Sequence, residues 1–261
     1  MSESNQSTSH TPAGDFDYEA HGSGYGLRRR TDPRIASLVH AALADARTVL
    51  NVGAGTGSYE PTDRYVVSVE PSESMRSQRS RDRPAMNGRA ESLPFDDDSF
   101  DAAMAMVTIH QWWDGDAGLR ELRRVSRGPV VILTFDGDAL DRFWLGDYAP
   151  ELIAAEKTRY PSMEHISRVL GGETSVQAVP IAIDCVDGFT EAFYARPEAF
   201  LEAEVRGSQS AWGFVDSEAE QRSISRLRED LDSGAWDRQY GSLRRLPEFV
   251  GSLRLVVSVP S

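Results

Sequence analysis

Residues 48–60 read TVLNVGAGTGSYE, in which an apolar run is followed by glycines at positions 53, 55 and 57. Glycine is favoured where the backbone adopts a positive φ or where another group approaches it closely. A glycine loop between a strand and a helix can bind a phosphate through the unpaired amides that begin the helix. Loops of that kind in dinucleotide-binding proteins read G-x-G-x-x-G, whereas the glycines here are spaced G-x-G-x-G. The spacing therefore disfavours a nicotinamide cofactor.

The residues on both sides of the glycine loop predict alternating strands and helices. Four apolar runs lack polar alternation, which is typical of buried parallel strands; they are TVLNV (48–52), RYVVSVE (64–70), FDAAMAMVTIH (100–110) and GPVVILTF (128–135). Apolar residues recur at helical spacing in 32–45, where Asp32 and Pro33 fit a helix start, and in 117–126. This order predicts an α/β fold, Rossmann-like and doubly wound, with a mostly parallel seven-stranded sheet and helices on both faces.

The remaining segments divide the chain into a tail, a core and an insertion. Residues 1–14 are rich in Ser, Thr and Asn and predict a disordered tail. Residues 15–136 predict the core, with an N-terminal lid segment at its start. Residues 137–250 hold more helical pattern than the sheet needs, and we interpret them as a helical lid inserted around one late sheet strand. Residues 251–261 predict the terminal sheet strand.

The composition disfavours several classes of protein. The chain has 261 residues, 40% of them hydrophobic, which is enough for one large core. Its net charge of −13 disfavours a nucleic-acid partner, and its longest apolar runs are far shorter than the roughly 20 residues of a membrane-spanning helix. The N-terminus has no apolar signal region, so a cytoplasmic location is expected. The single cysteine, Cys185, is interpreted as a small buried residue, with a nucleophile as the alternative.

Four motifs, in this order, resemble those of class I S-adenosylmethionine-dependent methyltransferases. VLNVGAGTG (49–57) is similar to the first motif of that family, and VVSVEPSESM (66–75) is similar to the second. GRAESLPFDDDSFDAAMAMVTIHQW (88–112) is similar to the third and fourth motifs of the ubiquinone/menaquinone-biosynthesis type, whose members methylate small molecules. The resemblance covers roughly residues 25–135. It implies S-adenosylmethionine as the cofactor and methyl transfer as the reaction.

The resemblance also implies which residues bind the cofactor. Glu70 ends the second strand, where an ionised carboxylate can accept hydrogen bonds from two ribose hydroxyls. Met75 is expected to cover one face of the adenine, with core packing as the alternative. Glu91 is expected beside the amino edge of the adenine, with a plain loop acid as the alternative. The other implied cofactor residues are Asn51, Gly53, Ala54, Gly55, Gly57, Pro71, Ala90, Met106, Val107 and Arg29.

Two features depart from the family pattern. Asn51 stands where members commonly have an acid that helps to hold the ammonium of the cofactor, and an amide supplies no charge there. The stretch from Gly57 to Glu70 is short and contains Pro61, so the helix after the first motif is expected to have at most two turns. We expect this shortening to leave Tyr59 and Glu60 beside the mouth of the pocket.

His110 is the main candidate for the reaction itself. It ends the third apolar run, and an imidazole titrates near neutral pH. Three roles stay open for it: a base or orienting group for the acceptor, a contact to the cofactor tail, or a structural residue. Tyr18 and Tyr25 are expected to close the pocket. Arg29 or Arg30 could pair with the carboxylate of the cofactor, the alternative being a solvated basic run.

The acceptor is predicted from the residues beyond the core. Aromatic side chains could form walls for a flat, apolar small molecule, and their alternative is ordinary core packing; the candidates are Trp112, Trp113, Trp144, Tyr148 and Trp212. We expect an aromatic or heterocyclic metabolite, a metal-independent reaction, no nucleic-acid or membrane partner, and a monomer or homodimer. Two alternatives remain: methylation of RNA or protein, and a non-catalytic relative that only binds the cofactor.

Overall fold

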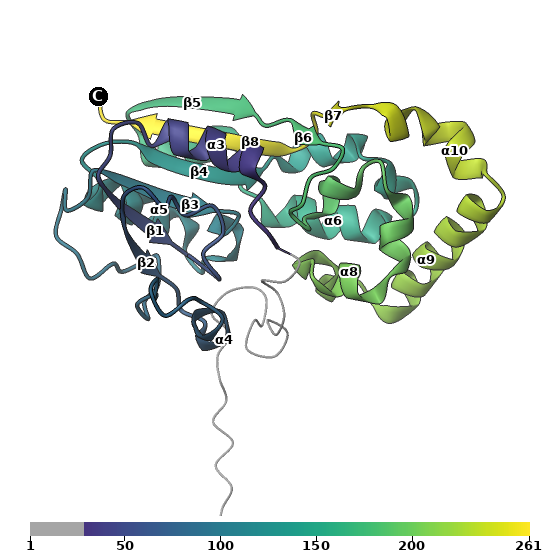
Figure 1. Ribbon diagram of the computed structural model, residues 1–261, viewed down its shortest axis with the longest axis horizontal. Helices are drawn as coiled ribbons and strands as arrows, with labels where there is room; N and C mark the ends of the chain where they lie inside the picture. Colours follow the sequence, from purple (N-terminus) through teal and green to yellow (C-terminus); the bar gives the residue numbers. More distant parts are fainter. Residues whose placement is uncertain (1–28) are drawn as a thin grey trace, which may run out of the picture.

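The computed structural model describes residues 29–261, and one six-stranded sheet organises them (Figure 1). Its strand order is β2-β1-β3-β4-β8-β5. The bounds are β1 Thr48–Val52, β2 Tyr65–Val69, β3 Ala102–Met106, β4 Val130–Phe135, β5 Glu173–Ala178 and β8 Leu253–Val259. The first four strands pair in parallel, whereas β8 is antiparallel to both of its neighbours. The predicted α/β fold with a mostly parallel sheet is confirmed.

The sheet has one strand fewer than predicted within the described range. At its β2 edge the next segment forms only an isolated parallel bridge, between Val69 and Met86. The Met86 amide donates to the Ser68 carbonyl over 2.8 Å, and its carbonyl accepts from the Glu70 amide over 2.9 Å. Pro84 and Gly88 stand on either side of this bridge, and both residue types weaken a strand. The pairing therefore stops after a single residue.

Helices cover both faces of the sheet, so the doubly wound arrangement is also confirmed. On one face α3 (Pro33–Ala42) packs on the sheet through Ile35 and Val39. Its start is as predicted, with the Asp32 carboxylate accepting from the Arg34 amide. On the other face α5 (Gly115–Val125) and α7 (Met163–Leu170) pack against a second apolar cluster. The short helix α4 (Glu73–Ser77) follows β2.

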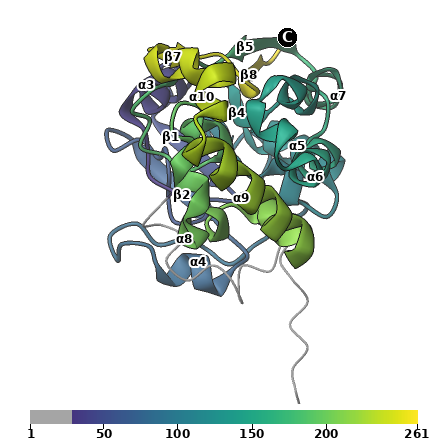
Figure 2. The ribbon, with the colours of Figure 1, turned by 90° about the vertical axis from the view of Figure 1, so that its right-hand side faces the viewer.

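The insertion forms a helical region beside the sheet (Figures 1 and 2). Its helices are α6 (Pro150–Arg159), α8 (Ala203–Gly207), α9 (Ser217–Asp232) and α10 (Ala235–Tyr240). It also contains the 3-10 helices η2 (Gly137–Arg142), η3 (Trp144–Asp147), η4 (Thr190–Phe193), η5 (Pro197–Leu201), η6 (Ser210–Phe214) and η7 (Gly241–Arg245), and the strand pair β6 (Ile181–Ala182) and β7 (Glu248–Phe249). One continuous apolar cluster joins this region to the α3 face of the sheet.

Prolines mark where two helical pieces of the insertion begin. Pro150 begins α6, which suits a residue without an amide hydrogen in a first turn. Residues 190–214 form four short helical pieces, η4, η5, α8 and η6. Pro197 begins the second of these pieces, and a proline within a longer helix would have disrupted it.

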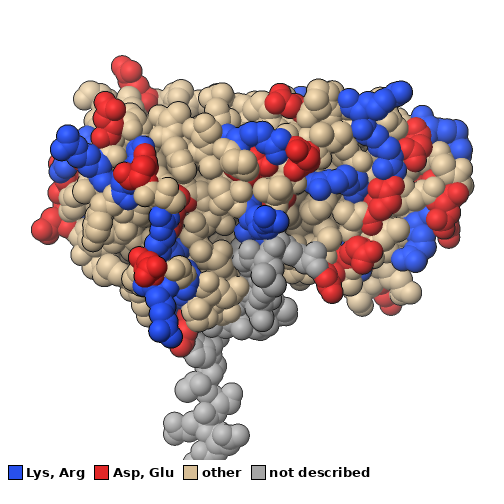
Figure 3. Space-filling model, in the orientation of Figure 1, with Lys and Arg blue, Asp and Glu red and all other residues tan. Residues whose placement is uncertain are grey.

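Charged side chains of both signs are interspersed on the face shown in Figure 3, including the surface of the helical region. Among the helices of residues 29–261, none is both long enough and apolar enough to cross a membrane.

Candidate active site

A cleft opens where β1, β2 and β3 end. Because the carboxyl ends of parallel strands meet at one edge of a sheet, the loops that follow them converge there. The residues that line the cleft are Arg29, Gly53, Ala54, Gly55, Thr56, Ser58, Tyr59, Glu70, Met75, Met106, Val107, Thr108 and Gln111. Eight of the thirteen predicted cofactor residues are among them: Arg29, Gly53, Ala54, Gly55, Glu70, Met75, Met106 and Val107.

The three glycines of the loop all have positive φ, at 65°, 50° and 98° in chain order. A Cβ on Gly53 would overlap the side chain of Thr108, and one on Gly57 would lie 3.0 Å from an Arg79 guanidinium nitrogen. At Gly55 a Cβ would meet nothing within 4 Å, and this residue lines the cleft. Close neighbouring side chains therefore leave no room for a Cβ at Gly53 and little at Gly57, whereas a Cβ at Gly55 would point into open space.

Glu70 lies next to Gly55 and has the geometry of a hydroxyl acceptor. Its Oε2 accepts from the Gly55 amide and its Oε1 from the Ser72 amide, each over 2.8 Å. A carboxylate has about four acceptor positions, so two remain for a ligand. Burial raises the pKa of Glu70, although these two amides act in the opposite direction.

The cleft fits the cofactor that the motifs imply. Glu70 has acceptor positions left for as many hydroxyls as a ribose carries, Gly55 leaves space on the backbone, and Met75 is a buried, adaptable apolar side chain in the wall. Val107 holds a positive φ of 54°, which is uncommon for a β-branched residue and is characteristic of functional sites.

Five predicted cofactor residues lie outside the cleft lining. The Glu91 carboxylate accepts from the backbone amides of Trp113 and Asp114, at 2.8 and 3.3 Å. Ala90 is buried against the core cluster that contains α5. The other three are Asn51, Gly57 and Pro71. The roles of these five as cofactor residues stay predictions.

The helix expected after the glycine loop is also absent. Residues 53–64, all within the described range, form turns, with Tyr59 at a positive φ of 65°. A buried ion pair supports the loop instead: Arg79 Nη2 lies 2.8 Å from Glu60 Oε1, and both side chains are 2% exposed. Arg79 also donates to the carbonyls of Ala54 and Gly55, at 3.3 and 3.2 Å.

Asn51 belongs to the same polar network. Its amide nitrogen donates to Glu60 Oε1 over 2.9 Å, and the Ser68 hydroxyl donates to the same oxygen over 2.7 Å. Asn51 therefore occupies the position where members of the family commonly have an acid, and its amide donates a hydrogen bond to the carboxylate of Glu60. Glu60, expected at the mouth of the pocket, is buried, whereas Tyr59 does line the cleft.

A second cavity adjoins the cleft and shares Arg29, Val107 and Gln111 with it. The other residues of its wall are His110, Phe135, Leu140, Ile153, Glu156, Tyr160, Phe189, Thr190, Glu191, Gln209, Ser210 and Ser252. They come from the end of β3, the end of β4 and the helical region. The insertion therefore contributes most of the wall of a compartment beside the cleft, and its role as a lid stays a prediction.

His110 lies in the wall of this second cavity. Its Nε2 is 3.3 Å from the amide nitrogen of Gln111, and its buried Nδ1 has no hydrogen-bond partner among the described residues. Its ring meets that of Tyr160 edge-on, with centroids 4.7 Å apart. Burial, with the charges of Arg159 and Arg29, lowers the pKa of His110 well below its usual value. The imidazole is therefore neutral at neutral pH.

Two acids share the cavity wall with His110. Glu191 is 1% exposed, and burial raises its pKa to about 7. Its carboxylate accepts from the backbone amide and the hydroxyl of Ser252. Glu156 is hydrogen-bonded to the Tyr160 hydroxyl and lies 4.0 Å from Arg159.

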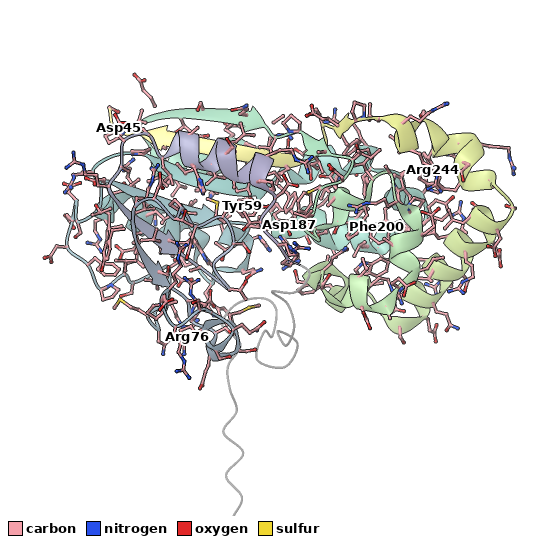
Figure 4. The ribbon with its side chains drawn as sticks, viewed as in Figure 1. Asp45, Tyr59, Arg76, Asp187, Phe200 and Arg244 are labelled. Carbon is pink, nitrogen blue, oxygen red and sulfur yellow. The ribbon has the colours of Figure 1, made fainter. Side chains whose placement is uncertain are left out.

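Arg29 lies at the junction of the cleft and the cavity. Its Nε donates to Asp187 Oδ1 over 2.7 Å, and the Tyr59 hydroxyl donates to Asp187 Oδ2 over the same distance. Figure 4 shows Tyr59 and Asp187 close together between the sheet and the helical region. Asp187 thus joins the insertion to the glycine loop and to the segment before α3. Arg30 is exposed.

The five aromatic residues predicted to hold the acceptor line neither the cleft nor the second cavity, and their role in binding the acceptor stays a prediction. Trp144 is buried in the helical region, where its indole nitrogen donates to the Tyr194 carbonyl. Tyr148 is also buried and donates to Asp230, and Trp212 is buried as well. Trp112 packs against the α5 cluster, and Trp113 is 61% exposed. Trp144, Tyr148 and Trp212 are buried because the added helical region needs large apolar side chains for a core of its own.

Some predicted residues lie outside the part of the chain that the structure describes. They are Tyr18, Tyr25, most of the N-terminal lid segment and the tail 1–14.

The predictions for the cysteine and for a metal fall within the described residues. Cys185 is buried, as expected, and burial raises its pKa to about 12. Residues 29–261 contain no group of three or more His, Cys, Asp or Glu that could hold a metal ion; metal independence stays a prediction.

Sequence reasoning missed several residues of the two walls. Thr108 and Gln111 flank His110 after β3, so their place beyond a strand end was a usable signal. Glu156 and Glu191 lie in helical segments without a recognisable motif. Nothing in their local sequence distinguishes them from solvated acids.

A family model and two curated proteins each match part of this chain. The model of a family described as "Methyltransferase domain" matches residues 50–132. The chain is 34% identical over 125 residues to a malonyl-[acyl-carrier protein] O-methyltransferase of Erwinia pyrifoliae, covering 44% of this chain and 46% of that protein. It is 36% identical over 94 residues to a demethylmenaquinone methyltransferase of a Mycobacterium species, covering 33% and 41%. The matches thus span less than half of these curated relatives.

One solved structure is similar over most of the chain. It is a protein assigned as a methyltransferase of an antibiotic biosynthesis pathway in Anabaena variabilis, with a TM-score of 0.83 and 28% identity. The match covers 89% of this chain and 99% of that one. The similarity therefore includes the helical region as well as the sheet.

Proposed function

Residues 50–132 form a methyltransferase domain, which identifies the chain as a class I S-adenosylmethionine-dependent methyltransferase, and on that premise we propose that it methylates a small organic acceptor. The resemblance predicted from the four sequence motifs is confirmed, as is S-adenosylmethionine as the methyl donor of the family. The acceptor is proposed to bind in the second cavity, and the cofactor in the cleft.

One observation carries this proposal: the cleft and the second cavity share three wall residues. A methyl group moves between two molecules only if they meet in line, so the two compartments must be contiguous. Val107 and Gln111 form that boundary together with Arg29. The second cavity has an apolar surface at Phe135 and Phe189 and polar groups around it, which suits a small molecule rather than a folded polymer.

Different residues of the cleft would bind different parts of the cofactor. S-adenosylmethionine supplies a methyl group on a positively charged sulfur, which an acceptor can attack directly. Glu70 would hold the two ribose hydroxyls, and Met75 would pack on the adenine. Arg29 remains a candidate for the carboxylate of the cofactor, with its Nε already bound to Asp187.

His110 is proposed to orient the acceptor. A neutral imidazole can donate from one ring nitrogen and accept at the other, and Nδ1 has no partner among residues 29–261. The lowered pKa makes His110 a weak base, so we favour hydrogen bonding to the acceptor over storage of a proton. The antibiotic-pathway assignment of the Anabaena protein supports an acceptor of the natural-product type.

The test is where a labelled methyl group goes. The full-length protein is incubated with methyl-labelled S-adenosylmethionine and with separate small-molecule, RNA and protein fractions of cells. We expect label in the small-molecule fraction only. Label in RNA or protein would contradict the proposal and favour a macromolecular substrate.

A further inference from the structure

The charged groups around the second cavity do not balance. The charge of Arg29 is matched by Asp187, whose carboxylate lies 2.7 Å away. Glu156 lies 4.0 Å from Arg159. Glu191 is the third charged group of the wall, and among residues 29–261 no Lys, Arg or His nitrogen lies within 4.0 Å of its carboxylate. When Glu191 is ionised, these five described groups, Arg29, Asp187, Glu156, Arg159 and Glu191, together carry one net negative charge.

The surroundings of Glu191 explain how the carboxylate is held without a cation. Within the described part of the chain its hydrogen bonds come from Ser252, with the backbone amide 3.1 and 2.9 Å from the two oxygens and the hydroxyl 2.6 Å from Oε2. Arg254 acts on Glu191 through space, but its guanidinium is ion-paired with Asp136 at 3.0 Å. Because a carboxylate has about four acceptor positions, Glu191 retains one for a group inside the cavity.

The remaining wall is apolar on one side and polar on the other. Phe135 and Phe189 meet with ring centroids 5.5 Å apart, and Leu140 and Ile153 extend the apolar surface. Thr190, Gln209 and Ser210 add neutral hydrogen-bonding groups, and His110 adds the buried Nδ1 without a partner among the described residues. The cavity therefore suits a molecule with an apolar body and a polar head.

We propose that the acceptor is a small apolar amine, bound as its ammonium with the charge beside Glu191 and the body against Phe135 and Phe189. Before transfer the ammonium gives one proton to the Glu191 carboxylate, and the lone pair of the neutral amine then attacks the methyl carbon. The bond from that carbon to the sulfur breaks, so the products are the protonated N-methyl amine and S-adenosylhomocysteine. The inference rests on the proposed function, because it assigns the occupant of the same cavity. An ammonium compensates a buried carboxylate, whereas a second anion beside it is repelled. A neutral alcohol donates a hydrogen bond but leaves the charge of Glu191 uncompensated.

The experiment measures binding rather than turnover. A library of matched triples, each an amine, an alcohol and a carboxylate with the same aryl or alkyl body, is screened by thermal shift against the full-length protein saturated with S-adenosylhomocysteine. The triple of phenethylamine, 2-phenylethanol and phenylacetate is one member. Dissociation constants of the binders are then measured by calorimetry. We expect the best amines to bind at least about 10-fold more tightly than their alcohols, and the carboxylates not to bind.

Variants identify the carboxylate responsible. In Glu191→Gln the amine preference should fall to about 3-fold or less. Glu229→Gln removes an exposed acid from the same helical region and should leave the preference unchanged. Should Glu191→Gln fail to fold, Ser252→Ala, which removes only the hydroxyl bound to Glu191, tests the same carboxylate and should alter amine affinity more than alcohol affinity.

Each outcome decides the matter. If alcohols or carboxylates bind as tightly as their matched amines, or if no amine in the library binds, the inference is overturned. It is equally overturned if Glu191→Gln folds and keeps the full preference. If the protein does not bind S-adenosylhomocysteine at all, the proposed function itself fails. The two failures are thus separated by the first step of the experiment.

Discussion

Replacing Arg79 with methionine removes the cation from a buried ion pair that supports the glycine loop. The Arg79 and Glu60 side chains are each 2% exposed, so solvent cannot replace the lost partner. The variant leaves Glu60 buried as an anion with two donors, from Asn51 and Ser68. It also removes the donors to the carbonyls of Ala54 and Gly55.

The expected cost follows from these contacts. Breaking a buried ion pair by removing one partner costs about 3–5 kcal/mol, because the other charge stays buried. We therefore expect Arg79→Met to lower the free energy of unfolding by about 3 kcal/mol or more, measured by urea denaturation. Since the loop loses a support, we also expect affinity for S-adenosylhomocysteine to fall by about 10-fold.

Two further variants make this test specific. Arg120→Met breaks an exposed ion pair with Asp116 and should cost less than about 1 kcal/mol. The double variant Arg79→Met/Glu60→Gln should cost less than the sum of its single variants, because the stranded charge is gone. A cost for Arg79→Met no larger than for Arg120→Met would refute the claim that the pair supports the loop.

Three further predictions concern the loop and the cavity. Gly53→Ala places a Cβ against Thr108 at a positive φ of 65°, and should lower the free energy of unfolding by about 2 kcal/mol or more, whereas Gly115→Ala, with open space around it, should be nearly neutral in the same urea titration. Burial raises the pKa of Glu191 from 4.5 to about 7, so the folded chain binds a proton more readily than the unfolded chain in that window. Stability from this group should therefore fall by about 3 kcal/mol as the pH rises from 4.5 to 7, and denaturation of Glu191→Gln at several pH values should lack that component. His110→Ala should lower turnover at least 10-fold with cofactor affinity nearly intact, and an equal loss of affinity in calorimetry would assign His110 to the cofactor instead.

The strands and the place of the cleft could be predicted because they depend on local patterns. Continuous apolar runs mark β1 and β4, and Asp32 followed by a proline marks the start of α3. Glu70 follows from the rule that ligands bind beyond the carboxyl ends of parallel strands. These signals need only neighbouring residues.

The contacts that close the site could not be predicted in this way. Arg79 and Glu60 are 19 residues apart, and their pairing exists only once α4 and the glycine loop are packed together. Trp144 and Tyr148 read equally well as core or as cavity wall, because an aromatic side chain fits both. Glu191 is held in the cavity wall by a hydrogen bond from the Ser252 hydroxyl, and Ser252 is 61 residues away in the sequence. Tertiary packing decides each of these cases.

The central claim is that Glu70 and the glycine loop form the binding site for the cofactor, and calorimetric titration with S-adenosylhomocysteine tests it directly. We expect the unaltered protein to bind one equivalent and Glu70→Ala to bind at least about 100-fold more weakly, because two hydrogen bonds to a charged acceptor contribute about 1.5–3 kcal/mol each. Glu70→Gln, which keeps one oxygen acceptor, should lie between the two. Glu73→Ala, which removes an exposed acid three residues away, should bind normally. Unchanged binding by Glu70→Ala, or no binding by the unaltered protein, would contradict the claim.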